Sequence, residues 1–124
     1  MKFVVDSSGW IEFFTNGKLA GEYANYLKDP AKVITPTIVL YEVYKKIKRE
    51  RTEEDALFAV SLMNRTDVVS LSESVALLAA DLSLKHDLPM ADAIVYATAL
   101  EQNCAVVTSD AHFKNLEKAT LISK

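Results

Sequence analysis

The chain has 124 residues, of which 50% are hydrophobic and 25% charged, with a net charge of −3 and three residues each of Gly and Pro. This composition excludes collagen-like, low-complexity and disordered chains, and the length predicts one domain over residues 1–124. We expect a cytoplasmic protein in a reducing compartment, because Cys104 is the only cysteine, no signal-peptide core precedes Asp6, and no apolar run approaches the ~20 residues that span a bilayer.

Short apolar runs alternate along the chain with longer segments of helical pattern. We expect strands at 3–5, 32–35, 67–71, 105–108 and 120–122, and helices near 8–15, 18–28, 37–50, 53–64, 73–86 and 90–103. Pro36-Thr37 and Thr52 are typical helix starts. Apolar strands separated by helices predict an α/β fold, in which a parallel sheet is covered on both faces.

Positive charge is concentrated in residues 45–51. This basic cluster holds five cations and one acid, a local charge of +4, whereas the other 117 residues sum to −7. Such a cluster can contact a phosphate backbone, or it can complement the dipole at the C-terminal end of a helix. Its cations are Lys45, Lys46, Lys48, Arg49 and Arg51.

Four acids are expected at the sheet edge where parallel strands end, which is where ligands bind in such folds. Asp6 directly follows the first strand, and Asp110 follows the fourth. Asp92 begins the otherwise apolar helix that leads into the fourth strand, so the start of this helix lies at the same edge. Glu42 lies early in the helix after the second strand. We call Asp6, Glu42, Asp92 and Asp110 the acidic quartet.

Each member of the quartet also has a purely structural explanation. The helix dipole stabilises an acid in the first turn of a helix, which applies to Asp6, Asp92 and Asp110. The apolar stripe of its own helix turns Glu42 toward solvent, within reach of Lys46 four residues later.

Clustering of the quartet would be costly without a cation, because like charges a few ångströms apart raise one another's pKa. All-oxygen ligands suit hard ions such as Mg²⁺ or Mn²⁺, which also hold water and substrate phosphate. A water of lowered pKa, an in-line displacement and a stabilised leaving oxygen together make phosphodiester hydrolysis. A clustered quartet therefore indicates nuclease chemistry.

Other kinds of site find little support in the sequence. His86 and His112 are 26 residues apart and lack ligand-spaced partners, which argues against zinc. Cys104 lies in an apolar run typical of a core, and Ser7 and Ser8 lack the elbow motif of serine hydrolases.

The quartet lies in four short motifs, which are Asp6-Ser7-Ser8 after an apolar strand, Glu42 in the helix after Pro36, Ala91-Asp92-Ala93-Ile94, and Thr108-Ser109-Asp110 followed by Phe113. In this order and at this spacing, the motifs resemble the PIN-domain nucleases over residues 6–113. The small size and the opening Val5-Asp6-Ser7-Ser8-Gly9-Trp10-Ile11-Glu12 are similar to the VapC-type toxins of prokaryotic toxin–antitoxin pairs.

The resemblance implies a three-layer α/β/α sandwich around a five-stranded parallel sheet, and an endoribonuclease that depends on Mg²⁺ or Mn²⁺. It also implies that the quartet is catalytic and binds the metal, with the hydroxyls of Ser7, Thr108 or Ser109 in support. Ser7 stands where many members carry Thr, and this keeps the hydroxyl. Homodimers are common in the family, as is a small antitoxin whose C-terminal segment covers the cleft.

Two further expectations concern partners. The basic cluster is expected to guide RNA toward the cleft, although a helix length could separate the two. Core packing accounts for most aromatic residues in the first third of the chain, and we expect a subset to line an apolar groove for the antitoxin. The candidates are Trp10, Phe13, Phe14, Tyr23, Tyr26, Tyr41 and Tyr44.

Two other classes of protein share this type of fold. A signalling receiver needs an acidic pair after its first strand and a Lys after its last, whereas here Asp6 is single and Lys118 precedes the last strand. A catalytically silent PIN-like module that binds RNA or protein would share the fold, but it would have no reason to keep four repelling acids.

Overall fold

Every strand and helix expected from the sequence is present in the computed structural model, which describes residues 1–123. The strands are β1 (Phe3–Val5), β2 (Val33–Pro36), β3 (Asp67–Val69), β4 (Ala105–Thr108) and β5 (Ala119–Leu121). The α-helices are α1 (Ser7–Phe14), α2 (Ala20–Leu27), α3 (Thr37–Glu50), α4 (Glu53–Met63), α5 (Glu73–His86) and α6 (Met90–Glu101), and short 3₁₀ helices span Pro30–Lys32 and Ala111–Phe113.

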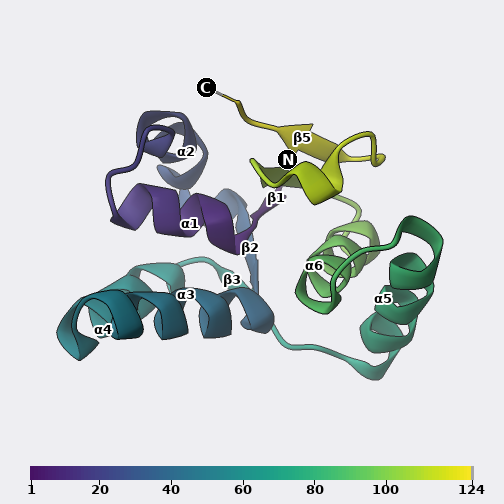
Figure 1. The fold of residues 1–124 in the computed structure, drawn as a ribbon, viewed down its shortest axis with the longest axis horizontal. Coiled ribbons are helices and arrows are strands. Elements are labelled where there is room, and N and C mark those ends of the chain that lie inside the picture. The colour runs from purple at the N-terminus through teal and green to yellow at the C-terminus, as the bar shows by residue number, and fades with distance from the viewer. Residues whose placement is uncertain (124) are drawn as a thin grey trace.

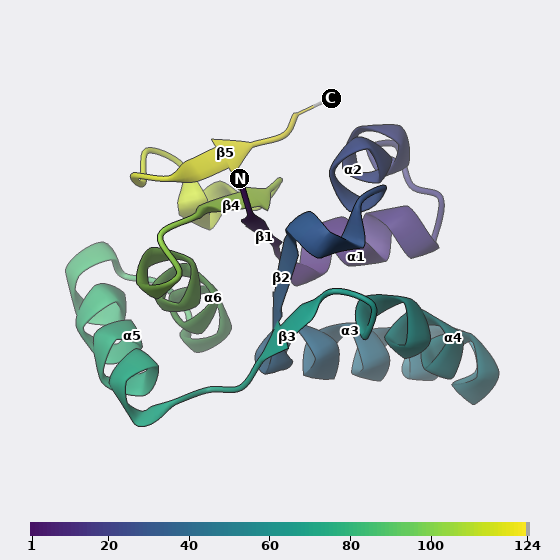
Figure 2. The same cartoon turned by 180° about the vertical axis from the view of Figure 1, so that it is seen from behind.

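The five strands form one parallel sheet in the order β3-β2-β1-β4-β5. Helices α1 to α4 lie on one side of the sheet and α5 and α6 on the other (Figures 1 and 2). This arrangement follows from right-handed crossovers, because the connections through α1 to α4 move outward from β1 to β3, and the connection through α5 and α6 returns to β4. The expected three-layer α/β/α sandwich is confirmed.

The core is continuous across both faces of the central strands. Val4 on β1, Ile34 on β2 and Val106 on β4 are almost completely buried, whereas the edge strands β3 and β5 remain partly exposed. Helix α6 buries six of its residues, in agreement with its nearly uniform apolar sequence. Burial of one such aliphatic side chain stabilises the fold by roughly 1.5–3 kcal/mol, so these layers hold the sheet edge in place.

The observed helix starts agree more closely with those expected from the sequence than the observed helix ends do. The Thr52 hydroxyl accepts a hydrogen bond of 3.0 Å from the backbone N–H of Asp55, which caps α4 as expected. Helix α6 ends at Glu101, two residues before the expected end, because Asn103 adopts the left-handed conformation with a φ of 53°. Within residues 1–123, no helix combines the length and the apolar character needed to cross a membrane.

Candidate active site

The site lies where the strand order reverses, between β1 and β4. Because one crossover leaves β1 toward β2 and the other enters β4 from the far side of the sheet, a crevice opens at their carboxyl ends. Asp6 follows β1, and its backbone N–H donates to the carbonyl of Val107 on β4 at 3.3 Å. Asp110 follows β4 and caps the 3₁₀ helix Ala111–Phe113. The sheet therefore brings two quartet members from opposite ends of the chain to one edge.

Three hydrogen bonds from neighbouring groups hold the Asp6 carboxylate in place. Its Oδ1 accepts from the Ser8 hydroxyl at 2.7 Å and from the Gly9 N–H at 3.2 Å, which caps α1. Its Oδ2 accepts from the Thr108 hydroxyl at 2.5 Å, and that hydroxyl in turn accepts from the Asp110 N–H at 2.9 Å. Burial raises the pKa of Asp6, while these hydrogen bonds oppose the rise. Thr108 thus links the two acids and sets their separation.

The close approach of α1 to the crevice depends on Gly9. A Cβ at this position would lie 2.3 Å from Cε1 of Tyr23 and 2.8 Å from Cγ1 of Val5. Tyr23 is fully buried, and its hydroxyl donates to the Ser109 hydroxyl at 3.0 Å. The small residue therefore lets the capped end of α1 and the buried ring of Tyr23 meet beside the site.

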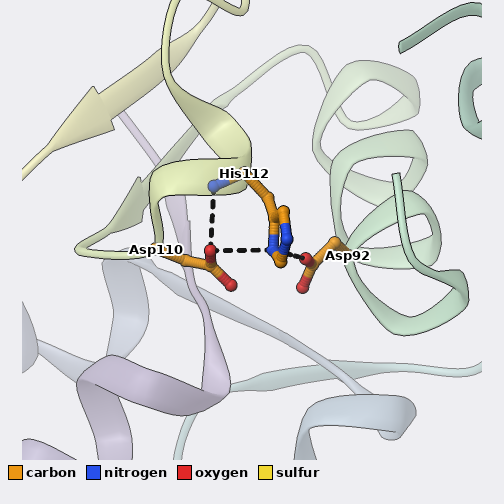
Figure 3. A group of neighbouring side chains, drawn as sticks. All are labelled: Asp92, Asp110 and His112. Carbon is orange, nitrogen blue, oxygen red and sulfur yellow. Dashed lines mark hydrogen bonds and ion pairs between the residues drawn. The ribbon is translucent and has the colours of Figure 1, made fainter. Parts of the chain in front are cut away.

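The second half of the site is more open and consists of Asp92, Asp110 and His112 (Figure 3). Asp92 is in the first turn of α6, and the ring of His112 lies between the two carboxylates. His112 Nδ1 is 3.0 Å from Asp92 Oδ2 and 3.0 Å from Asp110 Oδ1, and the His112 backbone N–H donates to the same Asp110 oxygen at 2.9 Å. One ligand atom from each residue lies within 4.8 Å of the other two.

Burial and the neighbouring carboxylates both raise the pKa of Asp92. Burial and, after it, the charge of Asp110 raise the pKa of Asp92 from 3.8 to about 6, while the neighbouring His112 lowers it. Asp6 and Glu42 also raise it. The charge of Asp110 and its hydrogen bond also raise the pKa of His112. The other three quartet carboxylates are therefore near enough to affect Asp92, although Asp6 and Glu42 lie outside the tight group formed with His112.

Glu42 faces a groove with a volume of about 550 Å³ between α1 and α3. The expected contact with Lys46 is absent, because Lys46 Nζ lies 2.6 Å from Glu50 Oε2, one turn further along α3. Because Lys46 pairs with Glu50, the Glu42 carboxylate faces the groove without this partner. Ser7 and Ser109, two of the three expected supporting hydroxyl residues, line the same groove, whereas Thr108 is buried beneath Asp6.

The basic cluster divides between the groove and the outer surface. Lys45, Lys46 and Arg49 line the groove together with Glu42, while Lys48 instead pairs with Glu53 at 3.1 Å. Arg51 lies outside this groove, at the end of α3. The spacing of Glu42, Lys45, Lys46 and Arg49 is that of one helix face, so helical periodicity would have predicted which cations accompany the acid.

The aromatic residues of the first third of the chain are mostly part of the core. Trp10 and Tyr23 are buried, and Phe13, Phe14, Tyr26 and Tyr44 are partly buried against the core, whereas Tyr41 is 57% exposed. Trp10 and Phe13 nevertheless line a second groove of about 190 Å³. The other residues of this groove are Leu27, Lys28, Pro30, Leu62, Arg65 and Thr66.

His112 is the residue that sequence reasoning missed. Its sequence distance from His86 argued against a zinc site, but its partners in space are Asp92 and Asp110. The available signal was its position two residues after Asp110, because an aspartate that caps a tight turn brings the residue two positions later close to its own carboxylate.

Comparisons with known proteins agree with this fold. The model of the PIN domain family matches residues 3–119. Among solved structures, the chain is similar to a protein of a toxin–antitoxin complex from Klebsiella pneumoniae, with a TM-score of 0.81, 19% identity and 96% of each chain covered. No curated protein sequence matches the chain.

Two further solved structures share the fold. One is VapC20 of Mycobacterium tuberculosis, a toxin that cleaves the sarcin–ricin loop, with a TM-score of 0.74, 16% identity, and coverage of 98% of this chain and 90% of the other. The second is DNA-bound VapBC from Salmonella typhimurium, with a TM-score of 0.76, 19% identity, and coverage of 98% and 97%.

Proposed function

Because the chain belongs to the PIN domain family, we propose that it is a divalent-metal-dependent endoribonuclease that hydrolyses RNA phosphodiester bonds. The main support is the approach of the acidic quartet to one sheet edge, beside a groove that Glu42 shares with Lys45, Lys46 and Arg49. Four interacting carboxylates oppose folding unless a cation neutralises them, so their presence together favours a metal site over a structural role.

The donor set fits Mg²⁺ or Mn²⁺. Carboxylate oxygens dominate it, and a bound cation would offset the burial and the charge of Asp110 that raise the pKa of Asp92. Asp92 and Asp110 would hold the ion together with Asp6 and Glu42. When bound, a divalent ion would add positive charge beside the scissile phosphate and lower the pKa of the attacking water.

The chain's own residues would position these groups. A carboxylate has about four acceptor sites, so Asp6 retains free acceptor capacity after binding Ser8, Gly9 and Thr108. Its hydrogen bonds keep it in place before any ligand arrives. The hydroxyls of Ser7 and Ser109 line the groove beside the quartet and can donate hydrogen bonds to phosphate oxygens of the substrate.

We propose further that the protein is the toxin of a toxin–antitoxin pair and acts in the cytoplasm, where Cys104, which is buried, would stay reduced. Proteins of the same fold occur in toxin–antitoxin complexes. The second groove has an apolar lining that includes Trp10 and Phe13, with Lys28 and Arg65 beside them, which suits an apolar segment with acidic flanks from a small antitoxin. A homodimer would cover exposed apolar residues of α5 and α6, such as Leu84 and Met90.

The test is cleavage of a generic single-stranded RNA by the purified chain in Mn²⁺ or in EDTA. We expect cleavage in Mn²⁺ and none in EDTA, and we expect Asp92→Asn to reduce the rate by at least about 100-fold, because the substitution removes a charged ligand while keeping its shape. Metal affinity, measured by calorimetry, should fall in the same variant.

The matched control is Asp81→Asn, the same chemical change at an exposed position of α5. Cleavage that persists equally in Asp92→Asn and Asp81→Asn would come from a contaminating nuclease and would contradict the proposal. Metal binding without cleavage of any RNA would favour the silent binding module instead.

A further inference from the structure

Helix α3 carries two tyrosine–lysine pairs with the same local geometry. Lys45 Nζ donates to the Tyr41 hydroxyl at 3.3 Å and lies 5.4 Å from the centre of the ring. Lys48 Nζ donates to the Tyr44 hydroxyl at 3.3 Å and lies 5.3 Å from that ring. Both pairs have the i, i+4 spacing that places side chains on one face of a helix. Local helix geometry therefore does not distinguish them.

Their surroundings differ strongly. Tyr44 packs partly against the core, and Lys48 is paired with Glu53 at 3.1 Å. Tyr41 is 57% exposed, and no carboxylate within residues 1–123 lies within 4.0 Å of Lys45 Nζ. The Tyr44–Lys48 pair is thus part of the packing between α3 and α4. The Tyr41–Lys45 pair instead presents an exposed ring and a cation that has no acidic partner among the described residues.

The exposed pair also lies inside the groove of the proposed active site. Tyr41 and Lys45 line it on the α3 side, next to Glu42. Ser7 and Ser109, which are adjacent in sequence to Asp6 and Asp110, line it as well, so the groove extends from the pair to the sheet edge where these acids lie. A substrate phosphate at the quartet would therefore place the neighbouring nucleotide along α3.

A ring and a cation together suit a nucleotide with an unpaired base. Proteins that hold single strands stack bases on aromatic rings and pair the phosphates with lysine or arginine. Building on the endoribonuclease function, we propose that Tyr41 and Lys45 form a nucleotide subsite for single-stranded RNA beside the scissile phosphate. The base stacks on the Tyr41 ring, and Lys45 contacts a phosphate. The subsite selects unpaired RNA, because a base held in a duplex cannot reach the ring.

The test is binding of a short fluorescent single-stranded RNA to the full chain carrying Asp92→Asn, which removes one repelling charge and prevents turnover. Anisotropy titrations in Mg²⁺ give the affinity, and a gel confirms that the RNA stays intact. We expect Tyr41→Leu to weaken binding about 5- to 100-fold, and Tyr41→Phe to retain nearly all of it, because stacking needs the ring and not the hydroxyl.

The second pair on α3 supplies the controls. Tyr44→Leu removes the ring that packs against the core, so its binding is compared only after thermal unfolding shows that the variant is folded. Lys45→Gln should reduce the dependence of log K on log salt by about 0.7, the value for one single-strand phosphate contact, whereas Lys48→Gln should change this slope less. For a duplex of the same length, Tyr41→Leu should bind like the parent chain.

The subsite is contradicted if Tyr41→Leu binds single-stranded RNA as tightly as the parent chain or as folded Tyr44→Leu. It is also contradicted if Tyr41→Leu weakens duplex binding equally, or if the parent binds no single-stranded RNA. A groove that binds a protein segment instead would leave the RNA affinity of Tyr41→Leu equal to that of the parent. In the cleavage-competent chain, Tyr41→Leu should raise KM for unpaired RNA more than it lowers kcat.

The two proposals fail separately. Metal-dependent cleavage that requires Asp92, together with RNA binding that does not depend on Tyr41, would leave the nuclease function intact and reject the subsite. Binding that depends on the Tyr41 ring, without cleavage in any metal, would support the subsite and reject the nuclease function.

Discussion

Asp6 and Asp92 bring the same functional group to the same crevice, but the protein holds them differently. Asp6 is 5% exposed, and its oxygens accept hydrogen bonds from a hydroxyl of α1, a backbone N–H and a hydroxyl of β4. The Asp92 side chain is 20% exposed, and its partner in the described part of the chain is the exposed His112. Folding alone therefore fixes Asp6, while the position of Asp92 depends on whichever positive charge lies beside it.

This difference separates two tasks within the site. The closed half, from Asp6 through Thr108 to the backbone of Asp110, is built by the same contacts that join β1 to β4. In the open half, which consists of Asp92, Asp110 and His112, burial and the charge of Asp110 raise the pKa of Asp92 even though His112 lies between the two carboxylates. Perturbing the closed half should reduce stability and activity together, whereas perturbing the open half should reduce activity and relieve repulsion.

The largest effect on stability is expected for Gly9→Ala in the closed half. The new Cβ would lie 2.3 Å from the buried ring of Tyr23 and 2.8 Å from Val5, both of which are held by the core. We expect a loss of about 2 to 3 kcal/mol in the free energy of unfolding, measured with urea, together with reduced cleavage.

Gly21→Ala is the matched control for this prediction. Apart from its chain neighbours and the backbone of its own helix α2, no atom lies within 4 Å of a Cβ at Gly21. Alanine there should stabilise the protein by about 0.5 to 1 kcal/mol, because it lowers the entropy lost on forming the helix. Equal unfolding free energies for the two variants would contradict the tight closed half.

Removal of Asp6 or of Asp92 is expected to change the free energy of unfolding less than Gly9→Ala does. Asp6→Ala should lower the free energy of unfolding by about 1 to 2 kcal/mol in EDTA, because the lost cap and hydrogen bonds outweigh the relief from burying a charge. Asp92→Ala should leave stability unchanged or slightly higher. If Asp92→Ala destabilises the metal-free protein as much as Asp6→Ala does, the two halves are not held differently.

Sequence pattern was sufficient for the fold and for the edge at which the acids meet. Parallel strands end at one edge, so the positions of Asp6 and Asp110 follow from the strand order once the strands are recognised. The apolar surroundings of Asp92 marked it as an unusual acid in the same way. The roles of the quartet in catalysis and metal binding stay predictions.

Side-chain pairing could not be predicted in the same way, because it depends on rotamers and on turn geometry. Lys46 has acids four residues away in both directions along α3, and it pairs with Glu50 rather than with Glu42. His112 reaches Asp92 only because the chain after Asp110 forms a 3₁₀ turn. Periodicity assigns a residue to a helix face, but it does not choose between two partners on that face.

The smallest expected effect is a dependence of metal-free stability on pH, which arises in the open half. Asp92 has a folded pKa of about 6 against 3.8 ordinarily, so the folded protein binds more protons than the unfolded chain between these values, and stability falls as pH rises through this range. The raised pKa of His112 acts in the same direction, because its stabilising charge is present below 6.5 and is lost as pH rises through the folded pKa. Water at the open site screens these charges, so we expect Asp92 to contribute about 1 kcal/mol.

Urea unfolding in EDTA between pH 4 and 8 measures this dependence, with Asp92→Asn as the comparison. The variant should lose part of the downward slope, and the remaining slope should include Asp6, whose pKa is also raised. Mn²⁺ should flatten the slope of the unsubstituted chain, because a bound cation favours the ionised carboxylates and replaces the charge that His112 provides at low pH. If the slope is the same with Mn²⁺ as with EDTA, the open half does not bind the ion, and its excess negative charge would need another explanation.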